Sequence, residues 1–362
     1  MNLSDFDYDL PLESIAQRPL GERDASRMLL LDRVSGQFQD GRFREFSALL
    51  RGDELIVVNN ARVLPGRLFG HRTGIRAEAA SANDRARNEF LSAPIEVLLV
   101  RPLGSNRWEA LVRPGRKIRV GERIVFAGDD LEAVVESRGE YGIRVLRFAS
   151  KGDFYETMVR FGHIPLPPYI KRDDEPADRE RYQTVYAKQG MAAAAPTAGL
   201  HFTPEVLASV RARGVEIAEI TLDVGLGTFE PVRTDRLEDH KIHTETYEIS
   251  DLAASAIERA RSAHRPILAI GTTAVRALED AIAKPDSKGI IAPGKYQADI
   301  FLYPGKPFHV VTQLLTNFHL PRSTLLALVA AFAGRESVLR AYRHAAESSY
   351  RFYSYGDCML IR

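Results

Sequence analysis

The sequence of 362 residues contains only one cysteine, Cys358. A single cysteine excludes an intramolecular disulfide framework, a zinc ribbon and a three-cysteine iron–sulfur site, and with the last of these the radical chemistry that depends on it. Long apolar runs are missing too, since the longest is about ten residues and a bilayer-spanning helix needs ~20. The acidic segment 1–9 has neither the basic start nor the apolar core of a signal peptide. We therefore expect a cytoplasmic protein with no membrane association.

A charge excess of one sign is likewise absent. The chain has 49 Lys and Arg against 48 Asp and Glu, which gives a formal net charge of +1. Overall charge therefore does not indicate nucleic-acid binding, and any such surface has to be local. The densest basic segment is 113–123, in which five cations accompany one glutamate. This segment predicts either a patch that contacts phosphates or a solvated strand face with a basic turn.

Residues 93–150 read as short strands separated by turns. Glycine marks each turn, and the predicted strands are 94–100, 107–112, 123–126, 131–136 and 143–148. Regular spacing of this kind predicts a small antiparallel β-barrel. The preceding residues 71–89 are rich in Arg, Ala, Ser and Asn and have no apolar periodicity, so we predict a mobile loop there.

From about residue 196 the pattern changes to strands that alternate with helices. The predicted strands are 215–224, 266–270 and 299–303, and the predicted helices are 205–213, 252–264, 274–283, 336–348 and one after Pro321. Two early segments, 26–32 and 54–60, have the composition of strands of the same domain. This alternation is typical of an α/β sheet. We predict an α/β catalytic domain of residues 1–60 and 151–362, into which residues 61–150 insert the barrel.

The most informative segment is 317–324 (NFHLPRST), which directly precedes a strongly apolar helix. It brings an amide, an imidazole, a guanidinium and two hydroxyls to the start of that helix. Free N–H groups and the helix dipole favour anionic or polarised ligand groups at such a place. The plain structural alternative is a helix cap, made by Ser323 or Thr324, beside satisfied core polar groups.

Three further segments pair small residues with polar groups near strand-to-helix junctions. Residues 196–202 (PTAGLHF) precede a helix, and His201 among them titrates near neutral pH. Residues 223–229 (DVGLGTF) follow a strand, but Glu230 stands where a dinucleotide fingerprint needs its third glycine. Residues 271–276 (GTTAVR) join a strand to a helix, where hydroxyls can bind a ribose or a carboxylate. A turn or a cap would also account for each segment.

Residues 239–247 (DHKIHTETY) suggest a metal site at first, because His240 and His243 are three residues apart. Side chains alternate along a strand, so these two imidazoles would face opposite sides. The alternation instead places Lys241, His243, Glu245 and Tyr247 on one face. We therefore predict no bound metal here, and either a polar ligand surface or an ordinary solvated strand face.

The polar segments at strand-to-helix junctions share small residues, hydroxyls and histidines, and they belong to one predicted sheet. Ligands bind at the carboxyl ends of strands in open α/β sheets, so these segments converge on one composite site. Their convergence favours an enzyme over a structural protein. Arg62 and Arg67 lie at the junction between the two predicted domains, where an interdomain ion pair is the alternative to a ligand contact.

Together these motifs resemble the S-adenosylmethionine:tRNA ribosyltransferase-isomerases of queuosine biosynthesis. The resemblance spans nearly the whole chain. The order of the matching segments is highly specific, although no single segment is. It rests on residues 5–11, 15–17, 60–63, 181–187, 195–203, 222–232, 271–273 and 317–324. The family implies an α/β domain with an inserted β-barrel, a monomer, and a site at the domain interface. The segment 71–89 is longer than the family leads us to expect.

The resemblance also implies a reaction. The ribosyl part of S-adenosylmethionine passes to the exocyclic amine of 7-aminomethyl-7-deazaguanine at the tRNA wobble position, and epoxyqueuosine forms as adenine and methionine leave. S-adenosylmethionine is then a consumed co-substrate, with no bound cofactor, and the anticodon arm of tRNA is the partner. The sulfonium acidifies the neighbouring ribose 5′ carbon, so that a carboxylate or an imidazole can remove its proton.

From this resemblance and the placement of the loops we predict the following roles. Asp223 is the first choice for the base, with His201 or His243 as proton carriers. The predicted substrate-binding residues are Thr197, Gly199, Gly225, Gly227, Thr228, Glu245, Thr272, Thr273, Arg276, Asn317 and His319. The predicted tRNA-binding residues are Arg62, Arg67, Arg113, Arg116, Lys117 and Arg119.

Two other functions compete with this one. An S-adenosylmethionine-dependent RNA methyltransferase would release S-adenosylhomocysteine in place of adenine, and the incomplete glycine fingerprint argues mildly against it. A non-catalytic RNA-binding protein built on the barrel would leave segments 196–202 and 317–324 without a purpose.

Overall fold

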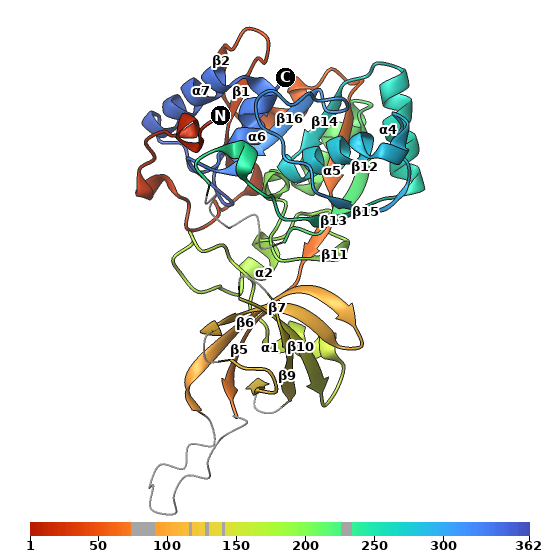
Figure 1. Ribbon diagram of the computed structural model, residues 1–362. Coiled ribbons are helices and arrows are strands. Elements are labelled where there is room, and N and C mark those ends of the chain that lie inside the picture. Colours follow the sequence, from red (N-terminus) through yellow and green to blue (C-terminus); the bar gives the residue numbers. More distant parts are fainter. Residues whose placement is uncertain (74–90, 116–117, 127–129, 140–141, 226–233) are drawn as a thin grey trace, which may run out of the picture. The chain divides into compact units, whose positions relative to one another are not determined.

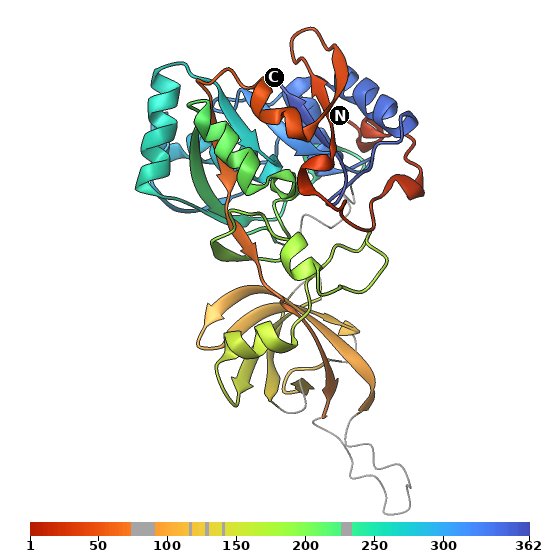
Figure 2. The ribbon, with the colours of Figure 1, turned by 180° about the vertical axis from the view of Figure 1, so that it is seen from behind.

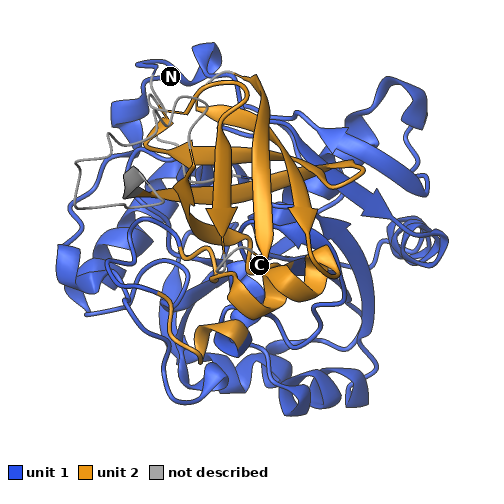
Figure 3. Ribbon diagram, turned by 90° about the horizontal axis from the view of Figure 1, so that it is seen from below, with its two compact units in different colours: residues 1–62, 167–173, 180–362 blue, residues 63–166, 174–179 orange. Residues whose placement is uncertain are grey.

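The computed structural model describes the chain except residues 74–90, 116–117, 127–129, 140–141 and 226–233. The described chain forms two compact units, which are coloured separately in Figure 3. The first unit contains residues 1–62, 167–173 and 180–362, and the second contains residues 63–166 and 174–179. The second unit thus continues past residue 150, where we predicted the insert to end. Most of the predicted loop 71–89 lies outside the described residues.

The first unit is built on a nine-stranded sheet (Figure 1). Its four central strands are parallel to one another and follow the order β12 (Glu216–Leu222), β3 (Leu55–Asn59), β14 (Ile267–Ile270) and β16 (Gln313–Asn317). The outer strands are β15 (Gly294–Ala298) and β13 (Glu245–Ile249) on one side, and β17 (Cys358–Ile361), β1 (Arg27–Leu31) and β2 (Phe38–Arg42) on the other. Parallel strands need cover on both faces, which explains why β3 and β14 are entirely apolar except for Asn59.

Helices cover the two faces of this sheet (Figures 1 and 2). One core joins alternate strand residues such as Leu55 and Val57 to helices α4 (Asp251–Ser262), α5 (Thr272–Ala283), α6 (Thr324–Ala333) and α7 (Arg335–Glu347). The intervening residues, such as Ile56 and Val58, join a second core with α3 (Pro204–Ala212) and the 3₁₀ segment Phe43–Leu49. The hydroxyls of Thr203, Ser250 and Ser323 cap α3, α4 and α6. No helix among the described residues has both the length and the apolar character needed to cross a membrane.

The second unit contains a closed antiparallel barrel, which confirms the predicted architecture. Its strands are β5 (Arg67–Arg72), β6 (Leu91–Gly104), β7 (Arg107–Arg113), β8 (Arg123–Phe126), β9 (Leu131–Arg138) and β10 (Ile143–Ser150). Burial alternates along β7, where Trp108, Ala110 and Val112 point into the core. Helix α1 (Phe154–Phe161), capped by Asp153, packs Phe154 against Trp108 with ring centroids 5.8 Å apart.

One predicted strand is wrong, and a second is formed only in part. Residues 299–303 are irregular, and the strand β15 lies just before them. The predicted strand across 239–247 is also irregular up to residue 244, because β13 begins only at Glu245. The two errors have one physical cause. Glu245 pairs with Ala298 at the end of the β13–β15 ladder, so neither segment has a strand partner beyond that pair among the residues that the structure describes.

His201 ends the 3₁₀ segment Thr197–His201 and lies in the interior of the first unit. Its Nδ1 is 2.9 Å from the Ser26 hydroxyl, and its ring lies 5.3 Å from that of Phe43. Burial and the nearby charges of Arg23 and Arg351 lower the pKa of His201 to about 3. The imidazole is therefore neutral at pH 7, and its Nε2 lies 3.3 Å from the Nδ2 of Asn317.

This burial predicts a pH-dependent stability. The unfolded chain binds a proton at His201 near pH 6.5, whereas the folded chain does so only near pH 3, so stability is lost as the pH falls through this window. The contribution amounts to about 1.4 kcal/mol per pH unit for each such proton. Denaturant unfolding of His201→Asn between pH 7 and pH 5 should show a shallower pH slope than the wild type.

His264→Asn is the matched control, because His264 is exposed and has the left-handed backbone that asparagine tolerates (φ 53°). This control should keep the wild-type pH slope. An unchanged slope in His201→Asn would contradict the assignment of His201 as a neutral buried group.

Candidate active site

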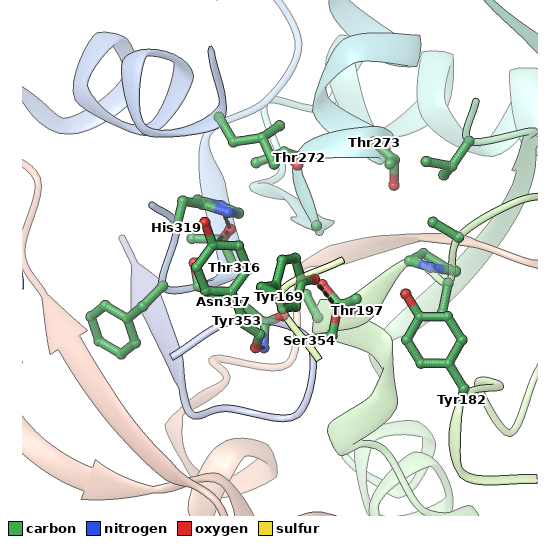
Figure 4. A pocket seen from close by; sticks show the side chains of 18 residues that line it. Tyr169, Tyr182, Thr197, Thr272, Thr273, Thr316, Asn317, His319, Tyr353 and Ser354 are labelled. Carbon is green, nitrogen blue, oxygen red and sulfur yellow. Dashed lines mark hydrogen bonds between the residues drawn. The ribbon is translucent and has the colours of Figure 1, made fainter. Parts of the chain in front are cut away.

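A cavity opens at the carboxyl ends of β12, β14 and β16 in the first unit (Figure 4). Because these strands are parallel, Val224, Gly271 and Asn317 reach the same edge of the sheet and line the cavity. The space measures about 620 Å³ when it is counted out to open solvent. All of its lining residues belong to the first unit.

Five of the predicted substrate-binding residues line this cavity. They are Thr197, Thr272, Thr273, Asn317 and His319. Gly271 joins β14 to α5 with φ 90°, a conformation that favours glycine, and it thereby turns the start of α5 toward the cavity. The first turn of a helix carries N–H groups without an intrahelical partner, so the Thr272 and Thr273 hydroxyls stand beside backbone donors that suit a carboxylate or a ribose.

Asn317 is buried at the floor of this site, with 2% of its surface exposed. Its Nδ2 donates to the carbonyl oxygens of Tyr353 at 3.1 Å and Asp357 at 3.3 Å, which fixes the orientation of the amide. Its Oδ1 is also buried and accepts no hydrogen bond from any described residue. An unpaired buried acceptor costs about 1–3 kcal/mol, and a ligand N–H or O–H group would remove that cost.

His319 faces the same cavity, and its Nε2 is 2.8 Å from the Thr316 hydroxyl. Burial lowers the pKa of His319 to about 3, so the ring is neutral at pH 7. A neutral imidazole offers one donor and one acceptor, which allows it to orient a polar ligand group without adding a positive charge to the cavity.

An aromatic wall completes the cavity, and our sequence analysis did not assign it. The rings of Tyr169 and Tyr353 lie 4.0 Å apart, and the Tyr169 hydroxyl is 2.5 Å from that of Ser354 (Figure 4). Tyr182 forms a further part of the wall. Aromatic faces attract flat rings and cations, which include a sulfonium. Tyr182 falls in one of the family-like segments, whereas Tyr169 and Tyr353 lie in irregular chain without a sequence signal.

A second group of predicted residues lies around a buried ion pair between Glu245 and Arg276. Arg276 also donates to the carbonyl oxygen of His243 at 3.2 Å, and the Gly225 amide donates to Glu245 at 3.1 Å. His243, Glu245 and Arg276 line a smaller pocket that shares Leu325 with the main cavity. The ion pair thus positions the chain on both sides of β13. The predicted polar face is not formed as proposed, because Lys241 and His243 precede the strand.

Asp223 follows β12, but its neighbour Val224 lines the cavity in its place. The Asp223 carboxylate accepts a hydrogen bond from the Met191 amide at 2.7 Å, and burial raises its pKa. Gly199 packs against the Tyr186 hydroxyl, where a Cβ atom would collide, so its role is close packing. Gly227 and Thr228 lie outside the described residues.

The predicted tRNA-binding residues are dispersed. Arg62 is the exposed middle residue of β4 (Ala61–Val63), and Arg67 in the barrel pairs with Glu96 at 2.9 Å. Arg113 and Arg119 are exposed at the end of β7 and beyond it, whereas Arg116 and Lys117 lie outside the described residues. The described part of the barrel therefore presents three exposed arginines from the basic segment 113–123, namely Arg113, Arg119 and Arg123, and the last of these pairs with Glu132.

Comparison with known proteins assigns the chain to a family. The family model described as "Queuosine biosynthesis protein" matches residues 3–361. Proteins named S-adenosylmethionine:tRNA ribosyltransferase-isomerase from Solibacter usitatus and Carboxydothermus hydrogenoformans are 53% and 47% identical to this chain, with 100% of each chain covered. A crystal structure of S-adenosylmethionine tRNA ribosyltransferase from Thermotoga maritima is 35% identical and matches with a TM-score of 0.53, over 99% of this chain and 100% of that one. The chain therefore belongs to the queuosine biosynthesis protein family.

Proposed function

We propose that this protein transfers and isomerises the ribosyl part of S-adenosylmethionine onto 7-aminomethyl-7-deazaguanine at the wobble position of tRNA. The products are epoxyqueuosine-tRNA, adenine and methionine. The observation that carries the proposal is the cavity of the first unit, which combines a helix start, an unpaired amide acceptor and an aromatic wall in a chain of this family. These groups suit a substrate that has a sulfonium, a ribose, a carboxylate and a purine.

In this proposal each part of the cavity meets a different part of S-adenosylmethionine. The start of α5 holds the carboxylate or the ribose hydroxyls, and the Asn317 Oδ1 accepts from a substrate N–H or O–H group. The faces of Tyr169 and Tyr353 lie against the sulfonium or the base. No metal is needed, since the sulfonium itself acidifies the ribose 5′ carbon. A base removes that proton, elimination opens the sugar and expels adenine, and the amine of the tRNA base captures the product as methionine leaves.

We further propose that the enzyme acts as a monomer in the cytoplasm, where tRNA is found. Its partner is the anticodon arm, and Arg113 and Arg119 of the barrel are candidates for contacts with the RNA backbone. S-adenosylmethionine is a consumed co-substrate, and we propose no bound cofactor.

Product analysis tests the reaction directly. The protein is incubated with S-adenosylmethionine and a tRNA that carries the 7-aminomethyl-7-deazaguanine base, and the small molecules are separated by chromatography. We expect adenine and methionine, and neither with a tRNA that has guanine at that position. S-adenosylhomocysteine would indicate a methyltransferase instead. Retained tRNA binding without turnover would favour the non-catalytic RNA-binding barrel.

The identity of the base can be tested with two variants. In Asp223→Asn the Oδ1 acceptor for the Met191 amide is kept, so the fold should be preserved. If Asp223 is the base, this variant binds S-adenosylmethionine normally, and its kcat falls by roughly 10²–10⁴. Glu219→Gln, at another carboxylate of β12, is the control and should keep its turnover.

Near-normal turnover of Asp223→Asn would remove this residue from the role. His319→Asn then becomes the deciding variant, because His319 lines the cavity and Asp223 does not. A kcat loss confined to His319→Asn would assign proton transfer to the imidazole.

A further inference from the structure

Four arginines gather around a short irregular segment, residues 17–21, of the first unit. Arg172, Arg181 and Arg351 donate to backbone carbonyls of this segment from two distant parts of the chain. The accepting carbonyls belong to Gln17 (3.0 Å), Arg18, Leu20 (2.7 Å) and Gly21 (2.9 Å). Arg23 follows the segment and donates to the carbonyls of Glu180 and Leu200 at 2.8 and 3.2 Å. We call these four side chains the arginine cluster.

The charge of three members, Arg23, Arg181 and Arg351, is only partly compensated within the first unit. Arg23, Arg181 and Arg351 form no ion pair with any carboxylate of the described chain, and all three are half-buried. Burial and the neighbouring charge of Arg181 lower the pKa of Arg23. The carboxylates of Glu180 and Asp357 act on Arg23 and Arg351 and offset part of their charge. A carbonyl satisfies the N–H groups of a guanidinium but leaves the guanidinium charge in place, so the positive charge that remains is costly to bury.

The barrel uses its arginines differently. Several of its surface arginines pair with glutamates of other strands at 2.8 Å, as between Arg101 and Glu109, Arg107 and Glu136, and Arg123 and Glu132. Such cross-strand pairs neutralise the charge locally. The arginine cluster, in contrast, retains a positive charge that an external anion can compensate.

The cluster lies next to the cavity along the chain and in space. Tyr182 directly follows Arg181, and Tyr353 and Ser354 come shortly after Arg351, and all three line the cavity (Figure 4). A small neighbouring pocket is lined by Arg23, Arg181 and Ser354, so Ser354 borders both spaces. The positive charge thus lies at the border of the proposed substrate site.

We infer that the arginine cluster binds tRNA phosphates next to the reacting nucleotide. The inference rests on the proposed function, because a base that enters the cavity within an RNA chain brings a phosphate on each side. Guanidinium groups match phosphate oxygens in geometry and remain charged at all relevant pH values. These contacts position the RNA without reading its sequence.

Equilibrium binding of the modified tRNA, measured without S-adenosylmethionine over a salt series, tests the inference. Arg23→Gln and Arg351→Gln should each weaken binding, and the slope of log K against log salt should become shallower by about one for each lost contact. Arg259→Gln is the control, because Arg259 is exposed and paired with Glu216 away from the cluster. Its affinity and salt slope should stay at wild-type values.

Lysine variants separate a phosphate contact from a purely structural role. Arg23→Lys and Arg351→Lys keep the charge but lose the fork that bridges the carbonyls. If the cluster binds phosphate, the lysine variants keep most of the salt slope that the glutamine variants lose. If lysine and glutamine variants show the same slope and the same loss of thermal stability, the cluster only holds residues 17–21 in place, and the inference is overturned.

Failure of the inference and failure of the proposed reaction give different results. Adenine release by the wild type, with an unchanged salt slope in every cluster variant, would refute phosphate binding and leave the reaction intact. A salt slope that changes only in Arg113→Gln and Arg119→Gln would transfer the RNA contact to the barrel and overturn the inference. If the wild type releases no adenine but the cluster variants have a shallower salt slope, the proposed reaction is refuted and phosphate binding by the arginine cluster is supported.

Discussion

The parallel alignment of β12, β3, β14 and β16 is the constraint on which the site depends. Parallel strands end at one edge of a sheet, so three segments that are far apart in sequence deliver Val224, Gly271 and Asn317 to one place. The apolar residues of β3 and β14 serve this arrangement, since they allow helices to cover both faces. The chemistry of the edge then comes from a few polar residues that follow each strand.

The first unit contains two groups of buried or half-buried charges, the Glu245–Arg276 ion pair and the arginine cluster, and they have different roles. Glu245 and Arg276 form a closed, buried pair that fixes the chain around β13, and removal of either partner would leave an uncompensated charge inside. The arginines beside residues 17–21 are held by carbonyls and keep their charge. The first arrangement fits a structural support behind the cavity, and the second fits a surface that meets an anionic polymer.

Much of the fold could be predicted because local signals agreed with the tertiary structure. The helices predicted at 205–213 and 252–264 correspond to α3 and α4, and the spacing of glycine turns identified the barrel. The strand predicted at 299–303 failed because strand pairing, which composition does not reveal, ends at Ala298. In the site, hydroxyls and amides next to strand ends were recognisable. Tyr169 and Tyr353 were not, since irregular segments bring them together and no periodicity marks them.

The central claim is that S-adenosylmethionine binds at the carboxyl edge of the parallel strands. The most direct test is a crystal structure of the protein with an unreactive analogue in which nitrogen replaces the sulfonium centre. The expected result is a ligand between the start of α5 and the tyrosine wall, with a donor group within hydrogen-bond distance of the Asn317 Oδ1. A ligand bound beside Glu245 and Arg276, with the main cavity empty, would contradict the claim.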